Sequence, residues 1–181
     1  MPCFSTPIYF SDRFLGEIIE NATEMEIDDF SQRYLFEPLG IENTDWVRFE
    51  TGLISADGGL EIAPRAMTKI GVTFLNRGVW AGQRIISEQW VENSAAIFPG
   101  NTRIRIPGTD NGRNGYSYSW WTKEYSHSGQ KINMYYAGGW GGQNIMVFPE
   151  LNAVIVFTGG NYTSKTTVFS ILEKYILPAI E

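Results

Sequence analysis

The residues that say most about chemistry lie in one glycine-rich segment near the carboxyl end of the chain. Residues 135–149 read Tyr-Tyr-Ala-Gly-Gly-Trp-Gly-Gly-Gln-Asn-Ile-Met-Val-Phe-Pro, with four glycines within five positions. Glycine leaves the backbone bare and accepts positive φ angles. Two interpretations are equally supported. The segment is a tight hairpin whose glycines supply positive φ, or an edge strand whose backbone N–H groups bind a substrate, as oxyanion donors or by β-augmentation.

Side chains that could act as a nucleophile with its base are few. His127 is the single histidine, and its polar surroundings are typical of a hairpin tip, so we expect a solvated loop histidine. The pattern Ser-x-x-Lys occurs once, as Ser128 and Lys131, in the same polar turn. A working Ser–Lys pair needs both side chains on one helical face in a sheltered pocket. The Gly-x-Ser-x-Gly pattern around Ser117 fails because Ser119 stands where the second glycine belongs.

The composition, and the motifs that the sequence lacks, argue against several classes of function. The sequence contains no HExxH, CxxC, GxxxxGK or full GxGxxG, and its single cysteine, Cys3, excludes a Cys-based zinc site, so we expect no metal and no cofactor. The net charge is −6 without a Lys/Arg cluster, which argues against nucleic acid as a partner. No apolar run is long enough to span a bilayer, and residues 1–7 lack the features of a signal peptide. The sequence alone does not assign a compartment.

The elements that must position the glycine-rich segment fall into two groups along the 181 residues. We expect a mostly helical lobe over residues 1–112, and antiparallel strands with a C-terminal helix over residues 113–181, which together share one core. The predicted helices begin at Ser11 or Asp12, at Asp28 or Asp29, at Pro64 and after Ser87, and end near residues 23, 37, 76 and 94. The first should bury Phe14, Leu15, Ile18 and Ile19. A long surface loop follows over residues 97–115, then strands at 116–122, 132–137, 143–148 and 153–158, and a helix at 164–177 that covers the sheet.

Several segments, in order, resemble the serine β-lactamase-like family, the penicillin-recognising fold of class C β-lactamases, D-Ala-D-Ala carboxypeptidases and related esterases. Residues 35–44 are similar to its "LF-PLGM--T" segment, residues 116–121 to its "YGYGWW" strand, and residues 137–143 to the "AxGxGGQ" version of its third motif. The match runs over about residues 13–177. The resemblance implies an α+β, β-lactamase/transpeptidase-like fold, present in part: a helical lobe followed by an antiparallel sheet with a C-terminal covering helix.

The resemblance also implies roles for residues of the glycine-rich segment. In the family a serine attacks a carbonyl and forms an acyl-enzyme, and a backbone N–H just after the third motif helps to hold the oxyanion. That donor maps to Trp140, or to Gly142 if the register slips by two residues. The residues Ala137, Gly138 and Gly139 would line the substrate. Because Ala137 replaces the third-motif lysine, which attracts the carboxylate of penicillins, we expect uncharged esters or amides to be preferred.

Departures from the family pattern are as informative as the matches. The family's Ser-x-x-Lys helix lies upstream of the segment that matches Leu15, and its Tyr-x-Asn motif falls on Pro7 and Tyr9, where neither residue type fits. We therefore expect a serine hydrolase fragment, inactive alone, whose complete parent is exported and takes a small ester, amide or peptide substrate. The alternative is a non-catalytic peptide- or acyl-binding module that uses the glycine-rich edge strand. Residues 152–158 would form an open apolar edge, which predicts self-association.

Overall fold

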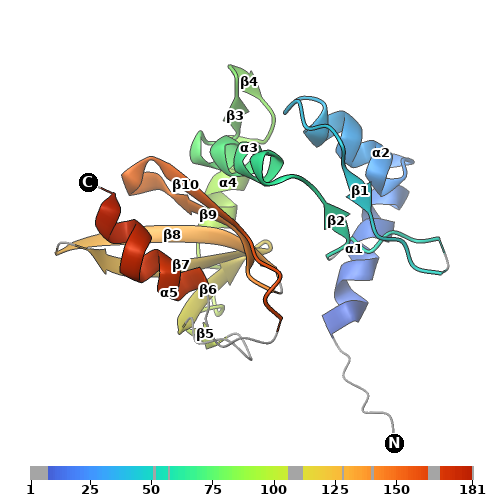
Figure 1. Ribbon diagram of the computed structural model, residues 1–181. Helices are drawn as coiled ribbons and strands as arrows, with labels where there is room; N and C mark the ends of the chain where they lie inside the picture. The colour runs from blue at the N-terminus through green and yellow to red at the C-terminus, as the bar shows by residue number, and fades with distance from the viewer. Residues whose placement is uncertain are drawn as a thin grey trace, which may run out of the picture. The chain divides into compact units, whose positions relative to one another are not determined.

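The computed structural model divides into two compact units, Met1–Ala66 and Met67–Glu181, which we describe separately (Figure 1). The residues that it describes are 8–50, 52–56, 58–105, 112–127, 129–139, 141–162 and 168–180.

The first unit is built mainly from helices. Its elements are α1 (Ile8–Thr23), α2 (Ile27–Ser31), a π-helical turn (Gln32–Phe36) and the short antiparallel pair β1 (Asp45–Trp46) and β2 (Leu60–Glu61). The helix α1 packs through Gly16, where a Cβ atom would lie 3.4 Å from the Cβ of Ala56. Leu15 and Ile18 are instead more than half exposed, so the prediction that they face inward is wrong. The predicted start at residues 11–12 is also wrong, since α1 already includes Ile8.

The second unit is a six-stranded antiparallel sheet with helices on both faces. In space the strands follow the order β10-β9-β8-β7-β6-β5, so sequence neighbours pair throughout. The strands are β5 (Ile104–Arg105), β6 (Arg113–Ser117), β7 (Trp120–His127), β8 (Gln130–Gly139), β9 (Gln143–Phe148) and β10 (Ala153–Thr158). The other elements are α3 (Pro64–Leu75), the hairpin β3 (Val79–Trp80) and β4 (Gln83–Arg84), α4 (Glu88–Ala95), a 3-10 turn (Pro149–Leu151), and α5 (Val168–Ile171) continued by a π-helical turn (Leu172–Ile176) and a 3-10 turn (Leu177–Ala179).

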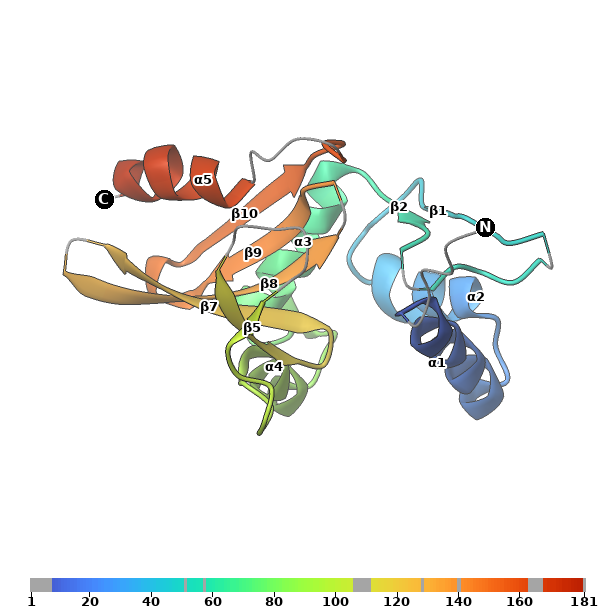
Figure 2. The same cartoon turned by 90° about the horizontal axis from the view of Figure 1, so that it is seen from below.

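The alternation of side chains along β8 fills two cores, one on each face of the sheet. Figure 2 shows α5 on one face and α3 and α4 on the other. Met134 and Tyr136 join the core under α5, whereas the intervening Tyr135 joins the core under α3 and α4. The helix α3 approaches the sheet closely at Gly71, where a Cβ atom would lie 2.5 Å from Val154 Cγ1. This arrangement confirms the predicted α+β fold with a covering helix at the carboxyl end.

Several local predictions can be compared with the observed elements. The strands predicted at 143–148 and 153–158 match β9 and β10 in both bounds, and Ser87 caps α4 by accepting the N–H of Trp90 at 3.2 Å. The single strand predicted over residues 116–122 is wrong. The chain reverses there between β6 and β7, with positive φ angles of 42° at Tyr118 and 68° at Ser119. The predicted loop over residues 97–115 is also wrong in part, since it contains β5 and the start of β6.

Candidate functional site

The carboxyl end of β8 differs from the rest of the strand in its pairing. Pairing with β7 extends only to Tyr136, opposite Trp121, whereas pairing with β9 continues to Gly139, opposite Gln143. The residues 137–139 therefore have a described strand on one side only. Because successive residues of a strand direct their N–H and C=O groups to opposite sides, either Gly138 or the pair Ala137 and Gly139 directs these groups to the unpaired side. This end of the strand can offer backbone donors or acceptors to a ligand.

This finding corrects the interpretation of the glycine-rich segment as an edge strand. The strand β8 lies inside the sheet, between β7 and β9: residues 130–134 pair with β7 alone, Tyr135 and Tyr136 pair with both strands, and residues 137–139 pair with β9 alone. Residues 137–139 have no partner in β7 because β7 begins only at Trp120, directly after the turn that the sequence did not predict. The open edge is therefore short and lies next to the hairpin that leads into β9.

The three predicted substrate-lining residues occupy different surroundings at this end. Gly138 and Gly139 are exposed, while Ala137 packs partly buried against the core under α3 and α4. A Cβ atom on Gly138 would lie 3.1 Å from both Asn144 Oδ1 and the ring of Tyr136, which leaves almost no room for a side chain. The backbone of Gly138 and Gly139 is therefore bare and exposed. Trp140, the predicted oxyanion donor, lies outside the described residues, so its role stays a prediction.

The hairpin after β8 is held by contacts that require glycine. Gly141 and Gly142 have φ angles of +84° and +89°, which side chains rarely adopt. The segment after β10 returns to this turn, since Gly159 N–H donates to the Gly142 carbonyl at 3.2 Å and Asn161 N–H to the Gly141 carbonyl at 2.9 Å. A Cβ atom on Gly159 would lie 2.6 Å from the Gly141 carbonyl oxygen. The turn is thus fixed by close backbone packing.

A buried polar contact supports the strand just before the glycines. The Tyr136 hydroxyl donates to Asn114 Oδ1 at 3.1 Å, and the Asn114 amide donates to the Gly112 carbonyl at 3.3 Å. Both side chains are almost fully buried, and the Tyr136 ring contacts Phe169 edge-on. Sequence reasoning missed this contact, because nothing in the pattern around Asn114 indicates that it faces β8.

Among the other side chains considered as nucleophile or base, the two that the structure describes, Lys131 and Ser117, are not placed for catalysis. Lys131 is 75% exposed and paired with Glu124 at 3.0 Å, so it lacks the sheltered surroundings of a catalytic lysine. Ser128, the serine of the only Ser-x-x-Lys pattern, lies outside the described residues. Ser117 is buried and donates its hydroxyl to the Asn93 carbonyl at 2.8 Å, which confirms that it is no exposed nucleophile. His127 ends β7 opposite Gln130, at the hairpin where it was predicted; the position of its side chain lies outside the described residues.

Metal-ligand clusters and membrane-spanning helices are both absent from the described residues. Among them, no group of three or more His, Cys, Asp or Glu side chains is placed to hold a metal ion. No helix in this part of the chain has the length and apolar character needed to cross a membrane.

Comparison with known proteins places this geometry in a family. Residues 10–166 match the family model described as Beta-lactamase. The chain belongs to the beta-lactamase family. This membership confirms the resemblance that the motifs indicated, and it covers the whole sheet and the glycine-rich segment.

Individual relatives agree with the family and show how much of each protein the chain represents. The 6-aminohexanoate-dimer hydrolase of Paenarthrobacter ureafaciens is 27% identical over 149 residues, which are 78% of this chain and 36% of that protein. A Bacillus anthracis structure assigned as a 6-aminohexanoate-dimer hydrolase superposes with a TM-score of 0.75 at 23% identity, over 96% of this chain and 43% of that one. Simvastatin synthase from Aspergillus terreus superposes with a TM-score of 0.66 at 14% identity, over 93% and 52%. The chain thus spans about half or less of the length of these relatives.

Proposed function

We propose that this chain supplies the oxyanion-binding strand and the acyl-pocket wall of a serine hydrolase that works by acyl-enzyme chemistry on an ester or amide. The observation that carries the proposal is the end of β8, where residues 137–139 are paired on one side only and where the glycines are exposed. A carbonyl substrate placed along this end would meet backbone and not side chains. We further propose that the nucleophile is not among the serines of the chain, which is therefore inactive alone.

The proposed reaction assigns a role to each residue at this end. A serine oxygen attacks the substrate carbonyl, and the carbonyl oxygen becomes negatively charged. The intermediate collapses to the acyl-enzyme as the alcohol or amine leaves with the proton that the serine gave up, and water then hydrolyses the acyl-enzyme to the free acid and the serine. The Trp140 N–H would donate to that oxyanion, with Gly142 as the alternative donor. One such donor contributes about 10²- to 10³-fold in rate. Gly138 and Gly139 would leave room for the acyl group, while the contacts of Gly159 with the turn would keep the donor in place.

The absence of an internal nucleophile is supported by the surroundings of the candidates. The Ser-x-x-Lys pattern lies at the hairpin between β7 and β8, and its lysine is exposed and ion-paired. Ser117 is buried against α4. The family's own Ser-x-x-Lys helix has no counterpart in the printed sequence, so we propose that this pair is provided by another polypeptide segment.

The proposed substrates are uncharged linear esters or amides and not β-lactams. The position of the third-motif lysine is occupied by Ala137, whose methyl group packs against the core and cannot attract a substrate carboxylate. One relative, from Paenarthrobacter ureafaciens, is a 6-aminohexanoate-dimer hydrolase, which supports a linear amide but not the absence of charge, because such a dimer keeps a free carboxylate.

The proposal can be tested by restoring the nucleophile. The part of the Paenarthrobacter hydrolase that precedes its region of similarity to this chain is fused to the chain, and p-nitrophenyl acetate hydrolysis is measured. We expect the fusion protein to be active and the chain alone to match its Ser128→Ala variant. In the fusion, Trp140→Pro removes the N–H donor and should lower the rate about 10²- to 10³-fold, whereas Trp140→Ala keeps the N–H and should change it little.

Each outcome of this test has a distinct meaning. Equal activity of the Trp140→Pro and Trp140→Ala fusions would contradict Trp140 as the donor. Hydrolysis by the chain alone that Ser128→Ala abolishes would contradict the missing nucleophile. Circular dichroism of both Trp140 variants shows whether either change disturbs the fold.

A non-catalytic binding module is the second candidate, and the same strand end favours it. Residues 137–139 leave a backbone edge to which an extended peptide could add by β-augmentation. Calorimetric titration with extended peptides discriminates the two functions. Binding by the chain together with an inactive fusion protein would favour the module.

A further inference from the structure

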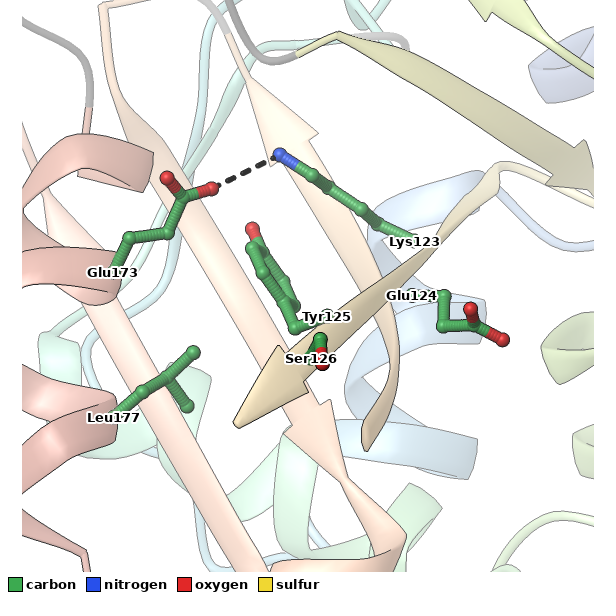
Figure 3. A pocket seen from close by; sticks show the side chains of 6 residues that line it. All are labelled: Lys123, Glu124, Tyr125, Ser126, Glu173 and Leu177. Carbon is green, nitrogen blue, oxygen red and sulfur yellow. Dashed lines mark hydrogen bonds and ion pairs between the residues drawn. The ribbon is translucent and has the colours of Figure 1, made fainter. Parts of the chain in front are cut away.

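A second polar site lies on the α5 face of the sheet, away from the end of β8. It is a groove of about 380 Å³ between β7 and the C-terminal helical segment. Its lining residues are Lys123, Glu124, Tyr125, Ser126, Glu173 and Leu177 (Figure 3). The four residues of β7 pair with residues 131–134 of β8, ahead of Ala137, so the groove is separate from the proposed oxyanion site.

Lys123 is a sheltered cation in this groove. Its side chain is only 14% exposed, and its ammonium lies 4.7 Å from the ring centre of Tyr125 and 5.1 Å from that of Phe169. Within the described residues its single carboxylate contact is Glu173, at 3.3 Å. An ammonium group has three donors, and partial burial strengthens its attraction for an anion. The groove therefore contains a cation with unused capacity to donate.

Tyr125 adds a second donor beside that cation. The residue is 8% exposed, and its hydroxyl is buried without a hydrogen-bond partner among the described residues. Figure 3 shows the hydroxyl pointing toward the contact between Lys123 and Glu173. Burial, together with the charge of Glu173, raises the pKa of Tyr125 far above its usual value, so the hydroxyl keeps its proton. Because buried polar groups are normally hydrogen-bonded, this donor indicates a missing acceptor.

We propose that the groove binds the carboxylate of a linear aliphatic acid, with Lys123 and Tyr125 as donors, and that Glu173 occupies the carboxylate position in the free chain. Glu173 is about half exposed and can turn into water, so exchange of one carboxylate for another leaves Lys123 paired. The alkyl chain would lie along Leu177. A dianion fits less well, because Glu173 stays close to the groove and would repel a second negative charge. This proposal does not rest on the proposed hydrolase function.

The test is a ¹⁵N–¹H NMR titration of the 181-residue chain with hexanoate, beside hexylammonium and inorganic phosphate. We expect hexanoate to shift the amides of residues 123–126 and 173–177 with a Kd on the order of 1 mM. Hexylammonium has the same number of carbon atoms with the opposite charge and should not shift them, and phosphate should bind at least tenfold more weakly. Absence of saturable shifts with hexanoate, or equal shifts with hexylammonium, would overturn the proposal.

Single substitutions test the two donors, Lys123 and Tyr125, separately from the competing carboxylate of Glu173. Glu173→Gln removes the competing carboxylate and should tighten hexanoate binding at least fivefold. Lys123→Met keeps the aliphatic stem and should abolish binding, Tyr125→Phe should weaken it several-fold, and Lys131→Met, at the exposed lysine, should leave it unchanged. Unchanged or weaker hexanoate binding by Glu173→Gln would contradict the proposal even if Lys123→Met fails to fold.

Discussion

The two ends of strand β8 contrast in what they offer to chemistry. At the β7 end the hairpin holds reactive residue types, Ser128 and Lys131, but the lysine is exposed and ion-paired with Glu124. At the β9 end the residues are glycines with no reactive side chain, yet the turn is fixed by backbone packing and its strand edge is open. Surroundings, and not residue type alone, therefore decide which end is suited to bind a substrate.

The largest expected difference between the two ends is in how each tolerates a methyl group. Gly159→Ala places a Cβ atom 2.6 Å from the Gly141 carbonyl oxygen, a backbone contact that cannot yield easily, and should lower the free energy of unfolding by about 3 kcal/mol. In the other hairpin, a Cβ atom on Gly129 would have no neighbour within 4 Å, so Gly129→Ala is opposed only by the positive φ of +77°. It should lower the free energy of unfolding by about 1 kcal/mol. Urea unfolding of both variants measures the contrast, and equal losses would contradict it.

The next largest effect tests the buried support beneath the glycines. Tyr136→Phe removes the hydroxyl that donates to Asn114 and leaves a buried amide oxygen without that donor. We expect a loss of about 1 to 2 kcal/mol in unfolding free energy. Tyr118→Phe, at an exposed ring, should stay within about 0.5 kcal/mol of the unchanged chain. Similar losses for the two variants would show that the buried contact does not support this end.

A smaller effect concerns the outer strand next to the β8–β9 hairpin. The strand β10 pairs only with β9 among the described strands and carries no charge or proline, so we expect the chain to self-associate. Thr158→Lys places a charge at the exposed end of this strand and should weaken the association about threefold. Sedimentation equilibrium measures both. A chain that stays monomeric at high concentration would contradict the open-edge account.

The smallest effect is expected at the exposed lysine of the β7–β8 hairpin. Lys131→Met removes a solvent-exposed ion pair and should change the unfolding free energy by less than about 0.5 kcal/mol. It should also leave background hydrolysis of p-nitrophenyl acetate unchanged. Loss of hydrolysis in this variant would mean that the hairpin carries chemistry after all.

Much of the sheet was predictable because its signals are local. The apolar run of β10 and the glycine-rich turn before β9 define those strands without reference to the rest of the chain. The turn at Tyr118 and Ser119 was missed because it takes positive φ angles without glycine or asparagine. Propensity alone could not reveal it, since neighbouring β-pairing sets that geometry.

The candidate site was predictable only in part, for a similar reason. The glycines of residues 138–142 indicated a bare backbone, but its accessibility depends on how far β7 extends beside β8, which is a long-range property. The Tyr136–Asn114 contact joins residues 22 positions apart and has no sequence signature. The face of α1 was misjudged because its stripe of apolar residues did not show that Gly16 makes the close contact.

The central claim is that the chain provides an oxyanion-binding strand end without a nucleophile. Intact-mass spectrometry of the purified chain after treatment with a fluorophosphonate tests it most directly. The account predicts an unmodified mass, while the fusion protein that restores Ser-x-x-Lys gains one adduct. A stoichiometric adduct on the chain alone, mapped to one of its own serines, would contradict the claim.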